Sequence, residues 1–130
     1  MKTNTIKTNI FFLLALINLV CCSDKEVINN PDFIKTEYEI TVNGSFQINL
    51  VSNPTTGYSW QWTNKQSISI VDTFNHGYIP KQPMLVGSGG KEIWRFKGIK
   101  TGTDTIKLEY CRSWDPNSTV ETKNISVIVK

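Results

Sequence analysis

Cysteine and histidine are scarce in this chain of 130 residues. Of its three cysteines, Cys21 and Cys22 fall within the first 22 residues, so Cys111 has no disulfide partner in the rest of the chain. An exported domain without a disulfide depends on its apolar core for stability. The single histidine, His76, together with one free cysteine does not make up a zinc site. We therefore expect no metal and no other cofactor.

Catalytic groups are equally few. His76 and Cys111 allow a Cys-His dyad in principle, since nucleophilic catalysis needs a thiol beside a base that is itself oriented by a third group. Nothing in the sequence orients His76, and Cys111 directly follows Tyr110 at the end of a predicted strand. We predict that the chain has no catalytic residues and is not an enzyme.

The excess of positive charge is small. The formal net charge of +3 includes Lys2 and Lys7, and removal of residues 1–21 as a signal peptide would lower it by two. Domains that bind nucleic acid carry a clustered basic surface, which this balance does not supply. Nucleic acid is therefore not an expected partner. Nothing in the sequence predicts a second copy either, so we expect a monomer.

A long apolar run is also missing. Residues 10–20 are apolar apart from Asn18, whereas a membrane-spanning helix needs roughly 20 apolar residues. The run follows Lys2 and Lys7 and ends at a polar stretch, which is typical of a secretory signal peptide. A spanning helix and ordinary secretion with cleavage nearby are the alternatives.

The end of this run resembles the lipobox of bacterial lipoproteins. Residues 19–22 read LVCC, so that Cys22 would become the first mature residue and carry the lipid. We expect a signal peptide over residues 1–21, a polar tether over residues 22–36 and a domain over residues 37–130. The predicted location is outside the cytoplasm, with the protein anchored by lipid to a membrane of the bacterial cell envelope.

From residue 37 onward the apolar residues alternate with a period of two. Phe46, Ile48 and Leu50 alternate with polar residues, which indicates a strand with one buried face. No stretch of ten residues has a helical pattern, so the class is all-β. The roughly 110 residues that would remain after removal of residues 1–21 suit one domain, and the spacing favours an immunoglobulin-like sandwich of about seven to eight antiparallel strands. Strands are expected near residues 37–42, 46–50, 58–63, 68–72, 92–97, 103–110 and 124–130, and core aromatic residues at Tyr58, Trp60, Trp62, Trp94 and Phe96.

Three segments do not fit strands. They are residues 52–57 (SNPTTG), 84–90 (MLVGSGG) and 111–120 (CRSWDPNSTV). Alternate connections of an antiparallel sandwich lie at the same end, where such domains present binding loops. Whether these three share an end depends on residues 68–79, which read either as one interrupted strand or as two. One strand would bring the loops together, and two would separate them.

The three segments resemble the motifs of chagasin-like inhibitors of papain-like cysteine peptidases. NPTTGYSW, then VGSGG leading to WRF, then LEYCRSW stand in the order and spacing of that family. The resemblance implies an immunoglobulin-like fold whose three loops form a wedge for the active-site cleft of the peptidase. It assigns peptidase binding to Asn53, Pro54, Thr55, Thr56, Gly57, Gly87, Ser88, Gly89, Gly90, Arg112 and Trp114.

One position departs from the family pattern. Ser113 stands between Arg112 and Trp114, where the family usually has proline. Serine leaves the backbone more freedom in the unbound state, so some loss of affinity is expected. Pro54 and Gly57, in contrast, suit a pre-formed loop, which lowers the cost of ordering on binding. The glycines at 87, 89 and 90 would leave main-chain groups free to bond to another protein.

Each motif also has a plainer explanation. NPTTG alone suits a tight turn, GSGG a flexible loop, and Trp114 a partly buried residue at the rim of the domain. A second hypothesis is therefore a surface-anchored immunoglobulin-like module that binds a glycan or an envelope protein, since a fold alone does not decide function. A third is a structural domain of a larger envelope assembly, which gives no reason for three shaped loops.

Overall fold

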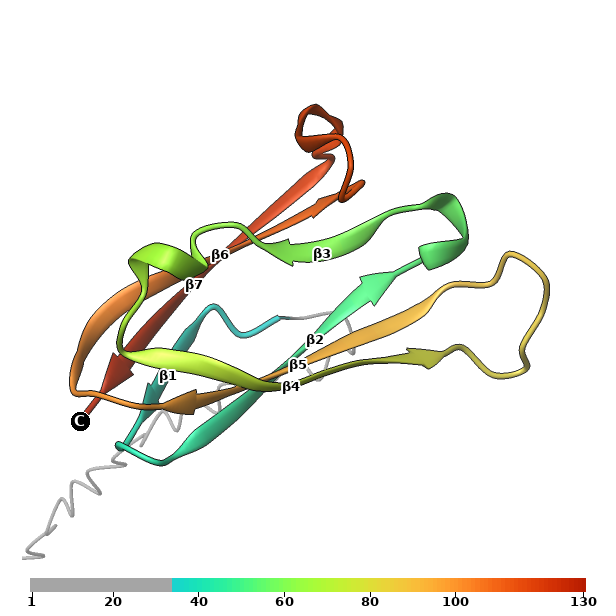
Figure 1. Ribbon diagram of the computed structural model, residues 1–130. Coiled ribbons are helices and arrows are strands. Elements are labelled where there is room, and N and C mark those ends of the chain that lie inside the picture. Colours follow the sequence, from blue (N-terminus) through green and yellow to red (C-terminus); the bar gives the residue numbers. More distant parts are fainter. Residues whose placement is uncertain (1–33) are drawn as a thin grey trace, which may run out of the picture.

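The computed structural model describes residues 34–130, and these form two facing β-sheets (Figure 1). The predicted signal peptide, Cys22 and most of the predicted tether lie outside the described residues. Seven strands and three short 3-10 helices make up the domain, which confirms the all-β sandwich. The helices are η1 (Pro54–Thr56), η2 (Lys65–Ser67) and η3 (Pro116–Ser118).

The seven strands divide into a sheet of four and a sheet of three. The first has the order β1 (Glu37–Ile40), β7 (Glu121–Val129), β6 (Gly102–Cys111) and β3 (Ser59–Trp62). The second has the order β2 (Ser45–Ser52), β5 (Gly90–Gly98) and β4 (Val71–Pro80). All pairs are antiparallel as expected except β1 and β7, which are parallel, with Glu37 opposite Ser126.

The alternation in the sequence corresponds to alternation in space. Along β2 every second side chain is buried, with Phe46 9%, Ile48 1% and Leu50 0% exposed. Successive side chains of a strand point to opposite faces, so a period of two gives one buried face. The two inner faces together form a single core of Phe46, Ile48, Leu50, Trp60, Ile70, Val71, Trp94, Phe96, Ile106, Leu108, Ile125, Val127 and Val129.

The predicted aromatic core is correct at three of its five positions. Trp60, Trp94 and Phe96 are buried. Trp62 is half-buried and packs its ring edge-on against Phe96, with 5.2 Å between centroids. Tyr58 is also half-buried, and it lies outside the core cluster because it precedes the first residue of β3 and stands at the end of the sandwich.

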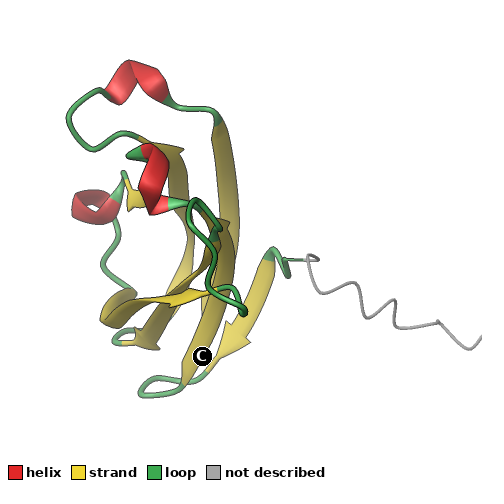
Figure 2. Ribbon diagram, turned by 90° about the vertical axis from the view of Figure 1, so that its right-hand side faces the viewer, coloured by secondary structure: helices red, strands yellow, loops and turns green. Residues whose placement is uncertain are grey.

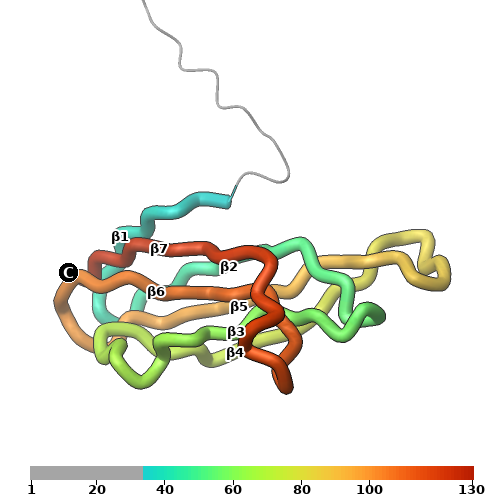
Figure 3. Tube along the Cα trace, turned by 90° about the horizontal axis from the view of Figure 1, so that it is seen from above, coloured from blue at the N-terminus to red at the C-terminus, as the bar shows by residue number. Residues whose placement is uncertain are grey.

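The ambiguous region between residues 68 and 79 contains one strand. β4 runs from Val71 to Pro80, and its register against β5 shifts between Thr73 and Asn75. Such a bulge disrupts the period of two, which is why the sequence reads as two pieces. With one strand here, the β2–β3, β4–β5 and β6–β7 connections lie at the same end of the sandwich, toward the right and top of Figure 1, and Figure 2 views the domain from the right-hand side of that picture. The C-terminus lies at the opposite end (Figure 3).

Candidate functional site

Three loops share one end of the domain, which we call the loop pole. They are the β2–β3 loop (residues 53–58), the β4–β5 loop (residues 81–89) and the β6–β7 loop (residues 112–120). The segments that the sequence separated by tens of residues are therefore neighbours in space. The geometry of the loop pole follows from contacts within each loop and between them.

The β2–β3 loop is a single tight turn that is closed by its own hydrogen bonds. Pro54 begins the 3-10 helix η1, where its fixed φ is compatible with helical geometry. The carbonyl of Asn53 accepts bonds from the backbone N–H of Thr56 (3.1 Å) and from its hydroxyl (2.7 Å). Gly57 ends the turn with φ of 80°, a left-handed conformation that favours glycine. The hydroxyl of Thr55 donates to the side-chain oxygen of Asn53 at 2.6 Å.

The β2–β3 loop packs directly against the β6–β7 loop. A Cβ atom on Gly57 would lie 2.8 Å from Cη2 of Trp114, so the indole ring lies over the glycine with no room for a side chain. Next to it, the guanidinium carbon of Arg112 lies 4.7 Å from the centre of the Tyr58 ring. This distance is typical of a cation–π contact. Gly57 is therefore required here both for its backbone conformation and for the space it leaves.

Asn53 connects the β2–β3 loop to the β4–β5 loop and to the end of β6. Its side-chain amide donates to the carbonyl of Gly87 in the β4–β5 loop at 3.1 Å. Its backbone N–H donates to the hydroxyl of Tyr110, the penultimate residue of β6, at 2.8 Å. Gly89 approaches the same region, since a Cβ there would lie 2.8 Å from the carbonyl oxygen of Ser52. The chain of Asn53 is thus held from two sides.

The β4–β5 loop has a closed base and an apolar tip. At its base, the backbone N–H of Lys81 donates to the carbonyl of Gly89 at 3.0 Å. Near its tip, the N–H of Ser88 donates to the carbonyl of Leu85, and the Ser88 hydroxyl accepts from the N–H of Leu85. Met84 and Leu85 are 70% and 68% exposed, and Val86 is fully exposed. Three consecutive apolar side chains therefore face solvent at the loop pole.

The β6–β7 loop presents an exposed aromatic ring on an ordered turn. The N–H of Asp115 donates to the carbonyl of Arg112 at 2.9 Å, which closes a four-residue turn. Asp115 also caps η3 by accepting from the N–H of Asn117, and the Ser118 hydroxyl accepts from the N–H of Arg112. Trp114 remains 71% exposed although it covers Gly57. It has the size and position of an anchor for another protein.

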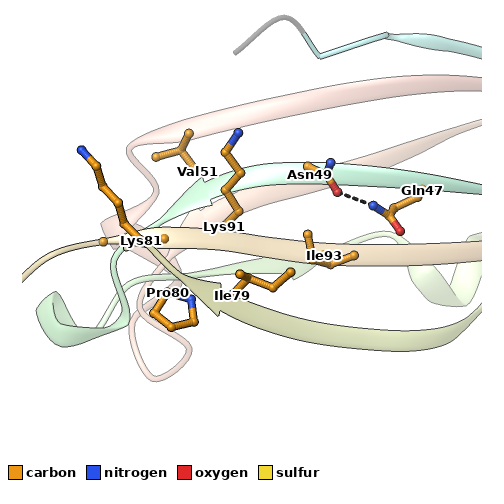
Figure 4. A pocket seen from close by; sticks show the side chains of 10 residues that line it. Gln47, Asn49, Val51, Ile79, Pro80, Lys81, Lys91 and Ile93 are labelled. Carbon is orange, nitrogen blue, oxygen red and sulfur yellow. Dashed lines mark hydrogen bonds between the residues drawn. The ribbon is translucent and has the colours of Figure 1, made fainter. Parts of the chain in front are cut away.

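A shallow hollow of about 700 Å³ lies beside the loop pole, on the outer face of the three-stranded sheet (Figure 4). Its walls are formed by β2, β4 and β5 and by the base of the β4–β5 loop, with Val51 and Ile79 exposed. It is not enclosed by the three loops. Of the motif residues, Gly89 and Gly90 line this hollow at the base of the β4–β5 loop.

Comparison with known proteins identifies this arrangement. Residues 39–129 match the family described as the chagasin family of peptidase inhibitors I42. The chain belongs to this family. The match covers all seven strands apart from the first two residues of β1, so the family relationship concerns the whole sandwich and its three loops.

Individual members of the family resemble the chain over most of the domain. Amoebiasin-1 of Entamoeba histolytica is 36% identical over 84 residues, which cover 65% of this chain and 80% of the relative. Chagasin of Trypanosoma cruzi is 32% identical over 78 residues, which cover 58% of this chain and 71% of the relative. The crystal structure of a cysteine protease inhibitor of Entamoeba histolytica superimposes with a TM-score of 0.60 at 25% identity, covering 75% of this chain and 88% of the other.

The motif residues of this chagasin-family domain lie together at the loop pole. Asn53 and Gly87 are joined by a hydrogen bond, and Gly57 and Trp114 are in contact, so the three motifs form one surface. Pro54, Thr55 and Thr56 are exposed at the tip of the β2–β3 loop. Gly90 lies slightly apart, as the first residue of β5, where a Cβ would overlap the carbonyl oxygen of Ile79.

One expectation about the glycine-rich motif needs correction. The sequence suggested that its main-chain groups are free to bond to another protein. In the structure, the carbonyl of Gly87 accepts from Asn53 and the carbonyl of Gly89 accepts from Lys81. These two bonds hold the loop to its neighbours, so the glycines serve close packing within the inhibitor as well as access from outside.

Sequence reasoning missed two features of the loop pole. The first is the apolar tip formed by Met84, Leu85 and Val86, whose only signal was three apolar residues next to glycine. The second is Glu92, which is 3% exposed. Its signal was position, because Glu92, Trp94 and Phe96 share the inward face of one strand.

Cys111 and His76 have different neighbours. Burial raises the pKa of the Cys111 thiol, and the nearby Glu109 carboxylate raises it further, so the thiol stays protonated and poorly reactive. The Nε2 atom of His76 lies 3.0 Å from Glu92. The members of this family are peptidase inhibitors, so the chain is not an enzyme. Within residues 34–130, no three His, Cys, Asp or Glu residues gather as metal ligands.

Proposed function

We propose that this chain is a reversible, tight-binding inhibitor of papain-like cysteine peptidases that blocks the active-site cleft with its three loops. The observation that carries the proposal is the mutual contact of three motif segments at one end of the sandwich. Asn53 bonds to Gly87, and Trp114 covers Gly57. Family membership and the likeness to a cysteine protease inhibitor of Entamoeba histolytica support a cysteine peptidase as the binding partner.

The β2–β3 loop suits a blocking role because it is not shaped as a substrate. A peptidase cleaves an extended segment whose scissile carbonyl is open to attack by the catalytic thiolate. In this loop the carbonyls of Asn53 and Pro54 point into the turn and accept bonds from Thr56 and Gly57. A loop held in this shape would occupy the catalytic centre without presenting a bond for cleavage. Its pre-formed turn also lowers the entropy cost of binding.

The two flanking loops supply contact area on either side. Trp114 brings a large exposed ring, and Arg112 is fixed beside it on Tyr58. Tryptophan and arginine are among the residues that dominate interface energies. On the other side, the tip at Met84, Leu85 and Val86 offers an apolar surface of smaller side chains. The β6–β7 loop and the tip of the β4–β5 loop would then contact the two walls of the peptidase cleft.

A titration tests the proposal directly. The chain without residues 1–22 is added to papain in the presence of a fluorogenic dipeptide substrate, and the inhibition constant is measured at several substrate concentrations. We expect competitive, reversible inhibition, with the inhibitor recovered uncleaved. No inhibition of papain and of two further papain-like enzymes at micromolar protein would favour the alternative, a surface module that binds a glycan or an envelope protein.

We also propose that the protein is exported and lipid-anchored through Cys22 in the bacterial cell envelope. The support is the sequence of residues 19–22 after an apolar run. Among residues 34–130, no helix has the length and apolar character to cross a membrane. Labelling of bacterial cells with radioactive palmitate tests this proposal. Label on the wild-type chain and none on Cys22→Ala is expected, whereas equal labelling of both would contradict it.

A further inference from the structure

Glu92 is an acidic side chain buried beneath the loop pole. It is 3% exposed, and in the described domain the only other buried polar side chain is Ser52. It lies near the start of β5, two residues after Gly90, and points between the two sheets. A carboxylate in such a place is costly unless its oxygens are satisfied by several donors. Its contacts therefore show what it does.

The carboxylate of Glu92 contacts three other strands. Oε1 accepts from the Ser52 hydroxyl at 2.6 Å and from the Trp60 backbone N–H at 3.2 Å. Oε2 lies 3.3 Å from the same N–H and 3.0 Å from Nε2 of His76. Ser52 belongs to β2, Trp60 to β3 and His76 to β4. One side chain on β5 thus connects both sheets.

Each of these contacts adjoins a loop of the wedge. Ser52 directly precedes Asn53, and Trp60 follows Gly57 by three residues, so Glu92 holds both ends of the β2–β3 loop. Glu92 itself follows the β4–β5 loop, and His76 is on the strand that leads into it. The Glu92 carboxylate therefore joins the strands that flank the β2–β3 loop and the β4–β5 loop.

His76 covers the carboxylate on its outer side. Its ring lies on Trp94, with 4.0 Å between centroids, and its side chain is 44% exposed. It is the one titratable partner that the structure gives Glu92, since the others are the Ser52 hydroxyl and the Trp60 amide. Glu92 is thus bonded on the inside to both ends of one loop and closed from the outside by an aromatic ring.

From these contacts we propose that Glu92 is a positioning residue for inhibition. Its carboxylate fixes the β2–β3 loop relative to the β4–β5 loop, so that the wedge is already formed before a peptidase arrives. Such pre-organisation lowers the ordering cost of binding and should raise affinity. The inference rests on the proposed inhibitory function for its effect on affinity, whereas its effect on loop order can be measured on the free protein.

The first experiment compares Glu92→Gln and Glu92→Leu in the full chain against papain. Glutamine keeps the size and one acceptor oxygen, whereas leucine keeps the size and loses both acceptors. We expect the inhibition constant to rise about threefold for Gln and at least tenfold for Leu, because Ser52 and Trp60 then lose their acceptor. Equal affinities for wild type, Gln and Leu would overturn the proposal.

A matched control separates positioning from general stability. Val127 is fully buried in β7, and it pairs with Tyr38 and Asp104 rather than with a loop residue. Val127→Ala should lower the melting temperature through a core cavity and leave the inhibition constant unchanged below that temperature. If Val127→Ala weakens inhibition as much as Glu92→Leu does, the effect is one of stability and the proposal fails.

Amide hydrogen exchange on the free protein gives a second, independent readout. In Glu92→Leu the amides of Thr56, Gly57 and Trp60 should exchange at least tenfold faster, while that of Ile125 in β7 stays protected. If wild type does not inhibit papain, the proposed function fails but this arm still decides whether Glu92 orders the loop. If Glu92→Leu does not fold, Ser52→Ala replaces it, and unchanged exchange at Thr56 and Gly57 would refute the positioning role.

Discussion

The β2–β3 loop and the β4–β5 loop reach the same end of the sandwich in opposite ways. The first is short and polar, and its backbone and hydroxyl groups bond within the turn or to its neighbours. The second is longer and bonded at its base, but it carries Met84, Leu85 and Val86 in full view of solvent. The two loops therefore combine a fixed centre with an apolar flank on one surface.

This difference fits two tasks within one interface. A catalytic centre has a fixed geometry, so the loop that we propose to enter it gains from having a single shape. The walls of a cleft differ between enzymes, and exposed aliphatic side chains adapt to different apolar surfaces. Changes in the β2–β3 loop should therefore weaken inhibition of every susceptible enzyme, whereas changes at the apolar tip should have effects that depend on the enzyme.

The largest effect is expected for Gly57→Ala. The new methyl group would meet the Trp114 ring at 2.8 Å, and alanine is disfavoured at φ of 80°. Both the turn and the indole must move, so we expect the inhibition constant for papain to rise on the order of 100-fold. The measurement is the same fluorogenic titration, with circular dichroism to confirm that the sandwich has formed.

Two other glycines serve as controls for this change. Gly87 also has positive φ, but a methyl group there meets nothing within 4 Å, so Gly87→Ala tests strain without a clash. Gly77 lies in β4 with open space around it and should tolerate alanine without effect. If Gly57→Ala is no worse than Gly87→Ala, the packing of Trp114 on the β2–β3 loop does not matter for binding.

The second effect is expected for Asn53→Ala, which removes the bond to Gly87 and the acceptor for Thr55. Two hydrogen bonds of ordinary strength correspond to roughly a tenfold loss of affinity. Thr55→Val is the matched variant, because it removes only the hydroxyl and leaves the connection between the loops. A loss as large in Thr55→Val would show that the bond to Gly87 contributes little.

A smaller and enzyme-dependent effect is expected when Met84, Leu85 and Val86 are all changed to serine. These side chains are exposed, so the melting temperature should stay the same. Affinity should fall about fivefold for enzymes with an apolar wall, as expected for partial burial of aliphatic groups, and less for enzymes with a polar one. The measurement is a panel of inhibition constants. An equal loss across the panel would remove the contrast between the two loops.

The sequence predicted the strands and the three loop motifs better than the side-chain contacts that hold the loops in place. The period of two located the strands because one buried face per strand imposes it, as in Phe46, Ile48 and Leu50. It failed along β4, where the irregularity between Thr73 and Asn75 interrupts the alternation without ending the strand. Local patterns record which way a side chain points, and a bulge changes that direction.

Contacts between distant segments were beyond sequence reasoning. The alternation of Tyr58 with Trp60 predicts a core position, but Tyr58 lies just before β3, beneath Arg112. Glu92 occupies an inward position, yet only the folded chain shows that Ser52, Trp60 and His76 satisfy it. Such partners lie on other strands, and one sequence contains no signal for their pairing.

The smallest effect concerns Ser113, which stands where the family usually has proline. It follows Arg112 in the turn that the Asp115 N–H closes, and proline is favoured at this second position of a β-turn. Ser113→Pro should therefore fit without distortion and stabilise the domain by about 0.4–1 kcal/mol, through reduced freedom of the unfolded chain. Because Trp114 is already held against Gly57, affinity should improve by about twofold or less. Thermal unfolding and the papain titration measure the two quantities. A gain in affinity much above twofold would mean that the β6–β7 loop is more flexible than its contacts indicate. It would then belong with the adaptable β4–β5 loop and not with the fixed β2–β3 loop.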